Sequence, residues 1–370
     1  MNYPIYIDYA ATTPVDERVL KEMLPFFTQH FGNATSRHHA FGWEAEEAVD
    51  EAKKKIARRL GCATLDIVFT SGATESINLA LKGVFENNHG HLITIKTEHK
   101  ATLDTAEYLK GEGNSVTYLD VDGQGNLDLN ELVKAIRPET KLISIMHVNN
   151  ETGVVLPISE VLKLAHSESV LVHVDATQSL GKLPFPEGAD LVSFSGHKIY
   201  GPKGIGCLIV KKEVNISTQT HGGKQQRNRR SGTLNVPGIV GLAEAVFLLD
   251  IEENERLEKL RDLFEKRVLS ELPNARINGQ EANRIGNISN ISFDGVDGEE
   301  ILMKLSKVAI SNGSACNSAY TEPSYVLRAM GLSEQNAFSS LRFSYGRFTT
   351  ERELVMAADH VIEKVKNLCS

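Results

Sequence analysis

The chain has 370 residues, of which 41% are hydrophobic and 24% charged, which is ordinary for a globular protein with one large and one smaller domain. Its formal net charge of −8 argues against a general binder of nucleic acid or membrane surfaces. The four cysteines include no Cys-x-x-Cys pair, which argues against a disulfide framework or a zinc site. The sequence shows no readable secretory signal and no apolar run near the roughly 20 residues that span a bilayer, so we expect a cytoplasmic protein.

The first predicted element is a helix over residues 44–60, where apolar residues recur at helical spacing and Gly61 provides a stop. Downstream, short β-branched runs alternate with helical patterns. The expected strands are 66–70, 91–95, 141–148, 170–175, 191–195 and 206–210. Because these runs are almost continuously apolar, they predict an α/β fold with a mainly parallel sheet flanked by helices.

A second long helix is predicted from near Pro237 to residue 272, which is long enough to bridge two domains. After it, residues 287–293 and 341–346 have strand patterns with helices between them, as in an α+β domain. We therefore expect a large domain over residues 15–255 and a small domain formed by 1–14 and 256–370.

Polar residues cluster after the expected strands, where open parallel sheets bind their ligands. After strand 66–70, Ser71 or Gly72 can start a helix whose free amides, with the Thr74 hydroxyl, would form an anion site. Taken alone, this motif favours a plain helix cap. Three later strand ends carry further polar residues, namely Asn149, Asn150 and Glu151, then Asp175 and Gln178, then His197 and Lys198.

These strand ends suggest a phosphate-bearing cofactor. No G-x-G-x-x-G follows a strand and no G-x-x-x-x-G-K-[ST] occurs, which weakens a nucleotide-binding interpretation. Pyridoxal 5′-phosphate (PLP) needs donors for its phosphate, an acid partner for its pyridine nitrogen and a lysine for its aldehyde. The anion site, an Asp, an Asn and a partly desolvated Lys fit that set.

Ten blocks of the sequence, from about residue 3 to about residue 355, resemble the cysteine desulfurases of the IscS/NifS type, which are fold-type-I PLP enzymes of the class V aminotransferase family. The blocks are "YIDYAATTP", "FGNATSRHHAFGWEAEEAVDEA", "VFTSGATESINLA", "KTEHKATLDT", "SIMHVNNETGVV", "HVDATQSLGKLP", "SFSGHKIYGPKGIG", "RSGTLN", "NGSACNSAYTEPSYVLRAMGL" and "SSLRFSYGRFTTERE". The resemblance implies a PLP-dependent enzyme that converts L-cysteine to L-alanine.

The resemblance also implies roles for individual residues. Lys198 carries covalently attached PLP, and His99 stacks on the ring and moves protons. Asp175 keeps the pyridine nitrogen protonated, while Gln178 and Asn150 contact the ring oxygen and the substrate side.

For the cofactor phosphate, the resemblance implies binding by Ala73, Thr74, Ser195 and His197. Thr233 is implied to reach the phosphate of the neighbouring subunit, which makes the active unit a homodimer. Arg342 is implied to hold the substrate carboxylate with its planar guanidinium.

The sulfur chemistry is assigned to Cys316. Its surroundings, "SNGSACNSA", are small and polar with Gly313 as a possible hinge, and composition alone fits an incidental surface thiol equally well. A PLP-bound cysteine that has lost its Cα proton can give its sulfur to a nearby thiolate, which then carries the sulfur outward. Cys316 would carry the sulfur as a persulfide and pass it to an acceptor protein for iron–sulfur cluster assembly, tRNA thiolation or DNA phosphorothioation. It would also be a transient iron–sulfur ligand shared with that acceptor. Cys62, Cys207 and Cys369 receive no role.

Three departures from the family pattern stand out: Gln226 in place of the usual Glu, "NGSAC" in place of "SGSAC", and an end at "KVKNLCS" without the scaffold-docking tail of the IscS subgroup. Taken alone, the basic run 224–230 fits a solvated loop, whereas the resemblance places it at the dimer interface, with Arg230 near the phosphate. A selenocysteine lyase or an aminotransferase is the alternative within the fold, and Cys316 argues against a transaminase. A non-catalytic nucleotide-binding or sulfur-relay protein is disfavoured by the missing glycine motifs.

Overall fold

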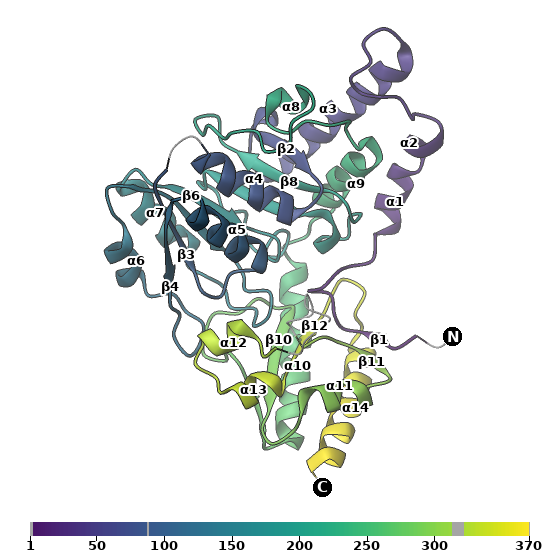
Figure 1. The fold of residues 1–370 in the computed structure, drawn as a ribbon. Coiled ribbons are helices and arrows are strands. Elements are labelled where there is room, and N and C mark those ends of the chain that lie inside the picture. Colours follow the sequence, from purple (N-terminus) through teal and green to yellow (C-terminus); the bar gives the residue numbers. More distant parts are fainter. Residues whose placement is uncertain (1–2, 87–88, 313–321, 370) are drawn as a thin grey trace.

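The computed structural model describes residues 3–86, 89–312 and 322–369. Figure 1 shows an upper and a lower part, with the N-terminal segment and helix α10 (Glu253–Glu271) running between them. The upper part contains a seven-stranded sheet, and the lower part contains a three-stranded sheet. A two-stranded parallel pair, β1 (Ile5–Tyr6) and β11 (Val308–Ala309), also belongs to the lower part.

The large sheet has the strand order β2-β8-β7-β6-β5-β3-β4. Its strands are β2 (Ile67–Thr70), β3 (His91–Ile95), β4 (Ser115–Leu119), β5 (Thr140–Met146), β6 (Leu171–Asp175), β7 (Leu191–Ser195) and β8 (Gly206–Val210). Strand β8 runs antiparallel to both of its neighbours, β2 and β7, and the other neighbouring pairs of this sheet are parallel. The predicted α/β fold with a mainly parallel sheet is confirmed. All six expected strands are present within two residues at each end, whereas β4 was not predicted.

Helices cover both faces of this sheet (Figure 1). One face carries α4 (Ala73–Phe85) and α5 (Lys100–Gly111). The other face carries α1 (Glu17–Met23), α3 (Ala40–Leu60), α6 (Leu129–Ala135), α7 (Ile158–Ser167) and α9 (Val236–Phe247), and the short α2 (Pro25–Thr28) contacts α9. Helix α3 contains the predicted helix 44–60 and ends at Gly61, which has a positive φ of 69° as its C-cap.

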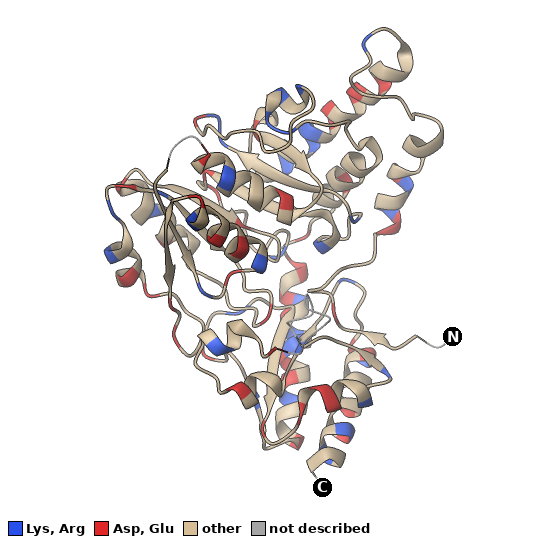
Figure 2. Cartoon of the chain, viewed as in Figure 1, with Lys and Arg blue, Asp and Glu red and all other residues tan. Residues whose placement is uncertain are grey.

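Charged residues of both signs are interspersed over the two parts, as Figure 2 shows, in keeping with a formal net charge of only −8 in 370 residues. None of the helices in the described ranges combines the length and apolar character that crossing a membrane requires.

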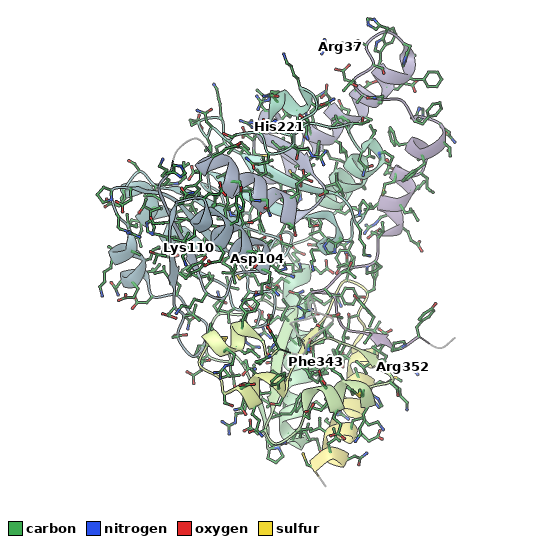
Figure 3. All side chains as sticks on the ribbon, in the orientation of Figure 1. Arg37, Asp104, Lys110, His221, Phe343 and Arg352 are labelled. Carbon is green, nitrogen blue, oxygen red and sulfur yellow. The ribbon has the colours of Figure 1, made fainter. Side chains whose placement is uncertain are left out.

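The lower part is built on the antiparallel sheet β12-β10-β9, with β9 (Ala275–Ile277), β10 (Ile288–Phe293) and β12 (Ser340–Ser344). Helices α10 and α14 (Glu351–Cys369) pack together beside it, and α11 (Gly298–Lys304), α12 (Tyr325–Ala329) and α13 (Glu334–Phe338) complete it. Its apolar core includes Ile7 and Phe264, whose ring lies 4.8 Å from that of Phe343, labelled in Figure 3. Because the lower part has its own core, we propose a large domain over residues 15–255 and a small domain formed by residues 1–14 and 256–370.

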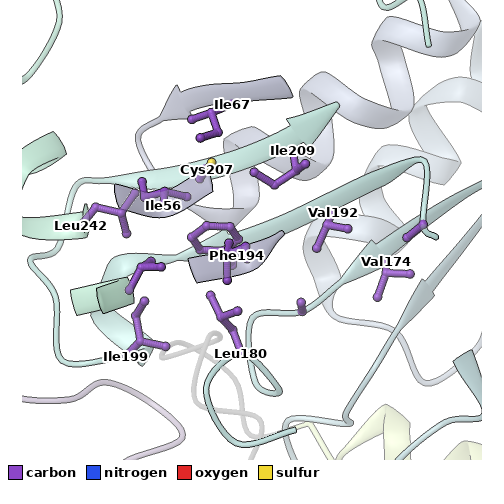
Figure 4. Packing of buried hydrophobic residues seen from close by; sticks show 14 of the residues in the cluster. Ile56, Ile67, Val174, Leu180, Val192, Phe194, Ile199, Cys207, Ile209 and Leu242 are labelled. Carbon is purple, nitrogen blue, oxygen red and sulfur yellow. The ribbon is translucent and has the colours of Figure 1, made fainter. Parts of the chain in front are cut away.

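The large sheet alternates its side chains between two cores. On β8, Cys207 and Ile209 face the core shown in Figure 4, where Ile56 of α3 and Leu242 of α9 also lie, whereas Leu208 faces the opposite core under α4. Burial raises the pKa of the Cys207 thiol well above its ordinary value. A buried, protonated thiol is a poor nucleophile, so Cys207 serves packing.

The prediction of one long helix after Pro237 was wrong, because the chain forms α9 and α10 with residues 248–252 between them. Side chains from elsewhere bind the carbonyls that α9 leaves unpaired at its end. Arg347 donates to Leu248 O (3.3 Å) and Arg59 donates to Leu249 O (2.8 Å). Asp250 then forms a local turn by accepting a hydrogen bond from Glu252 N.

Gly206 at the start of β8 is predicted to be required for the close packing of the strand ends. A Cβ there would lie 2.5 Å from Gly72 Cα and 2.8 Å from Phe194 O, both backbone atoms. Gly206→Ala should therefore destabilise the fold by about 1–3 kcal/mol, measured as a lower Tm. Gly111→Ala in α5 is the control, because no atom lies within 4 Å of the added Cβ. An equal Tm for the two variants would contradict the prediction.

Candidate active site

A cavity of about 620 Å³ lies at the carboxyl ends of β5, β6 and β7, where Met146, Asp175 and Ser195 end their strands. The start of α4, the N-cap of α5, strand β12 and the N-terminal segment also contribute side chains. Ten of the predicted site residues line it: Ala73, Thr74, His99, Asn150, Asp175, Gln178, Ser195, His197, Lys198 and Arg342. Six of these ten residues come from the strand-end argument, and the resemblance implied the others: Ala73, His99, Ser195 and Arg342.

Lys198 closes the 3₁₀ turn Gly196–Lys198, which directly follows β7. Its Nζ donates hydrogen bonds to Ala10 O (2.5 Å) and Ala11 O (2.6 Å). A Cβ on Gly196 would meet Pro202 O at 2.9 Å, so the turn that carries the lysine requires a glycine. The lysine amine is thus held at the cavity wall by backbone carbonyls.

One end of the cavity is suited to an anion. Gly72 is the N-cap of α4, and no side chain caps the first amides of this 13-residue helix. From the sequence alone, the motif over residues 71–74 favours a plain helix cap. In the structure, the first backbone amides of α4 remain available to an anion beside Thr74 and Ser195. His197 lies at the same wall with its Nδ1 3.1 Å from Thr12 Oγ1, and burial, with the nearby lysine charges, lowers the pKa of His197 to about 4.

Two polar atoms that line the cavity lack a partner among the described residues. Asn150 Oδ1 and Thr177 Oγ1 are both buried without a hydrogen bond. Asp175, two residues before Thr177, accepts a hydrogen bond from Thr177 N (2.9 Å) and also lines the cavity. Buried polar atoms normally have partners, so these groups are arranged for a polar ligand.

His99 is the N-cap of α5, and its Nδ1 accepts a hydrogen bond from Ala101 N (3.1 Å). Burial lowers the pKa of His99 from its ordinary value of 6.5, while Asp175 opposes this shift and Lys198 adds to it. Its neighbour Glu98 is fully buried and accepts a hydrogen bond from Met146 N (2.5 Å). Burial raises the pKa of Glu98 well above its ordinary range, and the Asp175 charge adds to the effect. Burial thus favours the neutral form of both side chains, the His99 imidazole at the cavity and the adjacent Glu98 carboxyl group.

Arg342 enters from β12 of the lower part and is only 4% exposed. Its Nη1 donates to Asn150 O (2.8 Å), and its Nη2 donates to Asp8 Oδ1 (2.9 Å) and to Ser311 Oγ (2.7 Å). Its Nε is buried and lacks a partner in the described part of the chain. Arg342 is the cation that the lower part contributes to the cavity.

Sequence reasoning missed the N-terminal segment of the site. Ala10, Ala11 and Thr12 line the cavity, and Ala10 O accepts hydrogen bonds from both Lys198 and Gln178. Most of this contribution comes from backbone carbonyls, which leave no mark on residue type. The only available signal was the run of small residues in "DYAATT".

Some predicted residues do not reach this cavity. Thr233 is exposed and is not among the residues that line it. Cys316 lies outside the described residues, and within those residues no group of three or more His, Cys, Asp or Glu could hold a metal ion. In the basic run, the Gln226 amide bonds the backbone of Phe69 in edge strand β2, and Arg230 pairs with Glu75 of the cavity wall (2.7 Å).

Comparisons with known proteins agree with this geometry. The model of the class-V aminotransferases matches residues 5–356. A curated relative named cysteine desulfurase IscS, from Anaeromyxobacter sp. (strain Fw109-5), is 51% identical and aligns with 100% of this chain and 94% of its own length. The chain belongs to the cysteine desulfurases of the class-V aminotransferase family.

Solved structures of family members support the same fold. A structure titled "NIFS-LIKE PROTEIN" superposes with a TM-score of 0.91 at 37% identity, covering 99% of this chain and 100% of that one. A structure titled "SspA in complex with cysteine" superposes with a TM-score of 0.84 at 38% identity, covering 93% and 99%. The cofactor of this enzyme family is PLP, bound covalently to a lysine.

The residues present fit PLP. The amides at the start of α4 with Thr74 and Ser195 suit its phosphate, and Asp175 suits a protonated ring nitrogen. Asn150 Oδ1 and Thr177 Oγ1 are orphaned polar atoms at the same wall. Lys198 is the lysine at the end of β7.

Proposed function

We propose that this cavity is where the cysteine desulfurase removes the sulfur of L-cysteine, with Lys198 as the attachment point of PLP. The observation that carries the assignment is the convergence of Lys198, Asp175, His99 and Arg342, from four separate elements, on one cavity. A lysine, a carboxylate, a neutral imidazole and an arginine are the groups that this chemistry requires. The relative named cysteine desulfurase and the SspA structure titled as a complex with cysteine support this substrate.

At the cofactor end, the phosphate is bound by Ala73, Thr74, Ser195 and His197. Asp175 faces the ring nitrogen, and Gln178 and Asn150 contact the ring oxygen and the substrate side. When bound, PLP supplies an electron sink that stabilises negative charge at the substrate Cα. The uncapped start of α4 and the orphaned Asn150 oxygen support these roles.

At the substrate end, Arg342 binds the carboxylate and His99 moves the proton. The buried guanidinium retains an unpartnered Nε–H, a donor that an anionic ligand can satisfy. The neutral imidazole of His99 can accept a proton at neutral pH, because burial lowers its pKa. These two groups orient the amino acid and remove a proton from it.

Cys316 is the proposed sulfur acceptor. Its thiolate attacks the substrate sulfur, the bond between that sulfur and Cβ breaks, and a new S–S bond forms. L-cysteine and the Cys316 thiol thus become L-alanine and a Cys316 persulfide, with atoms and electrons balanced and no outside oxidant. The thiolate, rather than the thiol, is the nucleophile in such a transfer.

We propose a cytoplasmic homodimer that hands sulfur to an acceptor protein, with Cys316 as a transient iron–sulfur ligand where the acceptor builds clusters. Thr233 is exposed on its own subunit, which supports a role toward the phosphate of the neighbouring subunit. Iron–sulfur cluster assembly is the supported use of the sulfur, because relatives at about half identity carry the name IscS. tRNA thiolation and DNA phosphorothioation are further uses of the same persulfide.

The function is tested by giving the purified enzyme L-cysteine and a reducing thiol and by measuring sulfide and alanine together. We expect equal yields, because each turnover releases one of each. Alanine without sulfide, or pyruvate in place of alanine, would refute the proposed reaction.

Lys198→Ala is predicted to abolish both the visible absorbance of the attached cofactor and all turnover, because it removes the amine to which the cofactor attaches. Absorbance spectra and alanine assays test this directly. Lys203→Ala is the matched control, since Lys203 also lines the cavity and should leave the absorbance intact. A coloured, active Lys198→Ala enzyme would refute the assignment.

Cys316→Ser is predicted to keep the cofactor absorbance and to bind L-cysteine, but to release no sulfide and to charge no acceptor, because serine cannot form a persulfide. Cys62→Ser, at a thiol whose pKa burial raises to about 11, should retain activity. Sulfur transfer at the normal rate by Cys316→Ser would contradict the role of Cys316.

The acid limb of the kcat/KM profile is predicted to lie below pH 6.5, the ordinary pKa of histidine. Burial favours the neutral imidazole of His99, so the base form persists as the pH falls and is lost only below 6.5. His99→Asn should reduce kcat about 10²–10⁴-fold without removing the cofactor colour. An acid limb above pH 6.5 in the unchanged enzyme would contradict this assignment.

A further inference from the structure

Asp8 is a partly buried acidic residue that the proposed reaction does not use. It directly follows the edge pair β1–β11, and its Oδ1 accepts hydrogen bonds from Arg342 Nη2 (2.9 Å) and from Ser311 Oγ (3.1 Å). The side chains of Arg342 and Asp8 are only 4% and 17% exposed. An ion pair of this kind is screened little by solvent, so it determines where the guanidinium lies.

The contacts of Arg342 divide into two groups by position. Asp8 and Ser311, which do not line the cavity, both bind Nη2, whereas Asn150, which lines it, accepts from Nη1. A guanidinium has five N–H donors, and these three bonds leave two, one on Nε and one on Nη1. Asp8 therefore holds Arg342 from outside the cavity and leaves donors for a ligand inside it.

We infer that Asp8 is a positioning residue for the substrate carboxylate, because it fixes the guanidinium of Arg342 before L-cysteine binds. This rests on the proposed function, in which Arg342 is the partner of that carboxylate. A long flexible side chain that is already held loses less freedom when its ligand arrives, so binding is tighter. The only charged partner of Arg342 in the described part of the chain is Asp8; the other two acceptors are neutral oxygens.

The test uses the holoenzyme and compares L-cysteine with cysteamine, which has the same amine and thiol but no carboxylate. For Asp8→Asn we expect the KM for L-cysteine to rise roughly tenfold, as when a charge-assisted hydrogen bond is lost, with kcat changed less than about twofold. The Kd for cysteamine, read from the cofactor absorbance, should stay within about twofold of the unchanged enzyme, since it makes no use of Arg342. Retained cysteamine binding also shows that the variant is folded.

Asp16→Asn is the matched control. Asp16 lies in the same N-terminal region, has a side chain that is 5% exposed against 17% for Asp8, and pairs with Arg347 (2.9 Å), an arginine that does not line the cavity. This variant should leave the KM for L-cysteine unchanged even if its Tm falls.

Arg342→Ala distinguishes the proposed role of Arg342, binding the substrate carboxylate, from the inferred role of Asp8, positioning Arg342. If Arg342→Ala raises the KM for L-cysteine selectively and Asp8→Asn does not, the inference about Asp8 is wrong while the role of Arg342 stands. If Arg342→Ala itself leaves the preference for L-cysteine over cysteamine unchanged, the proposed role of Arg342 fails and the inference falls with it. A gain in L-cysteine affinity in Asp8→Asn would also overturn it, because it would make Asp8 a competitor of the substrate.

Discussion

The geometry of the site depends on the hydrogen bonds from Lys198 to the carbonyls of Ala10 and Ala11. A partly buried amine needs hydrogen-bond acceptors, and here they come from a backbone that approaches Nζ to within 2.6 Å. Thr12 on the same segment contacts His197. The segment from Ala10 to Thr12 therefore sets the position of the lysine and of its histidine neighbour, and small side chains allow this approach.

The same segment connects the two parts of the molecule. Ala10 packs with Val148 of the upper part and with Ile285 and Ile288 of the lower part in one small apolar cluster. Beyond β12, a Cβ on Gly346 would lie 2.0 Å from the ring of Tyr9, so strand and segment pack without space for a side chain. The distance between Lys198, on the large sheet, and Arg342, on the small one, is therefore determined by contacts of residues 8–13.

The sequence predicted the strand-end residues because parallel strands share one carboxyl edge, so Asn150, Asp175 and Lys198 were expected to meet there. It could not predict the contribution of Ala10 and Ala11, since carbonyl acceptors exist at every residue. The break between α9 and α10 was equally hidden, because the groups that cap it, Arg59 and Arg347, are far away in the chain. Strand β4 was missed for another reason: it is a half-buried edge strand that includes polar residues, without the continuous apolar run of the others.

Burial shifts the pKa values of two adjacent residues, Glu98 and His99, in opposite directions. Burial acts in opposite directions on adjacent residues, lowering the pKa of His99 and raising that of Glu98, because in both cases it disfavours the charged form. Burial and the Asp175 charge favour the neutral form of Glu98, whereas the Met146 amide that donates to its Oε1 opposes this shift. Asp175, in contrast, lines the cavity, where a cationic ring nitrogen can pair with it. Access to the cavity thus distinguishes Asp175, which lines it, from Glu98, which does not, although Asp175 ends β6 and Glu98 follows β3 of the same sheet.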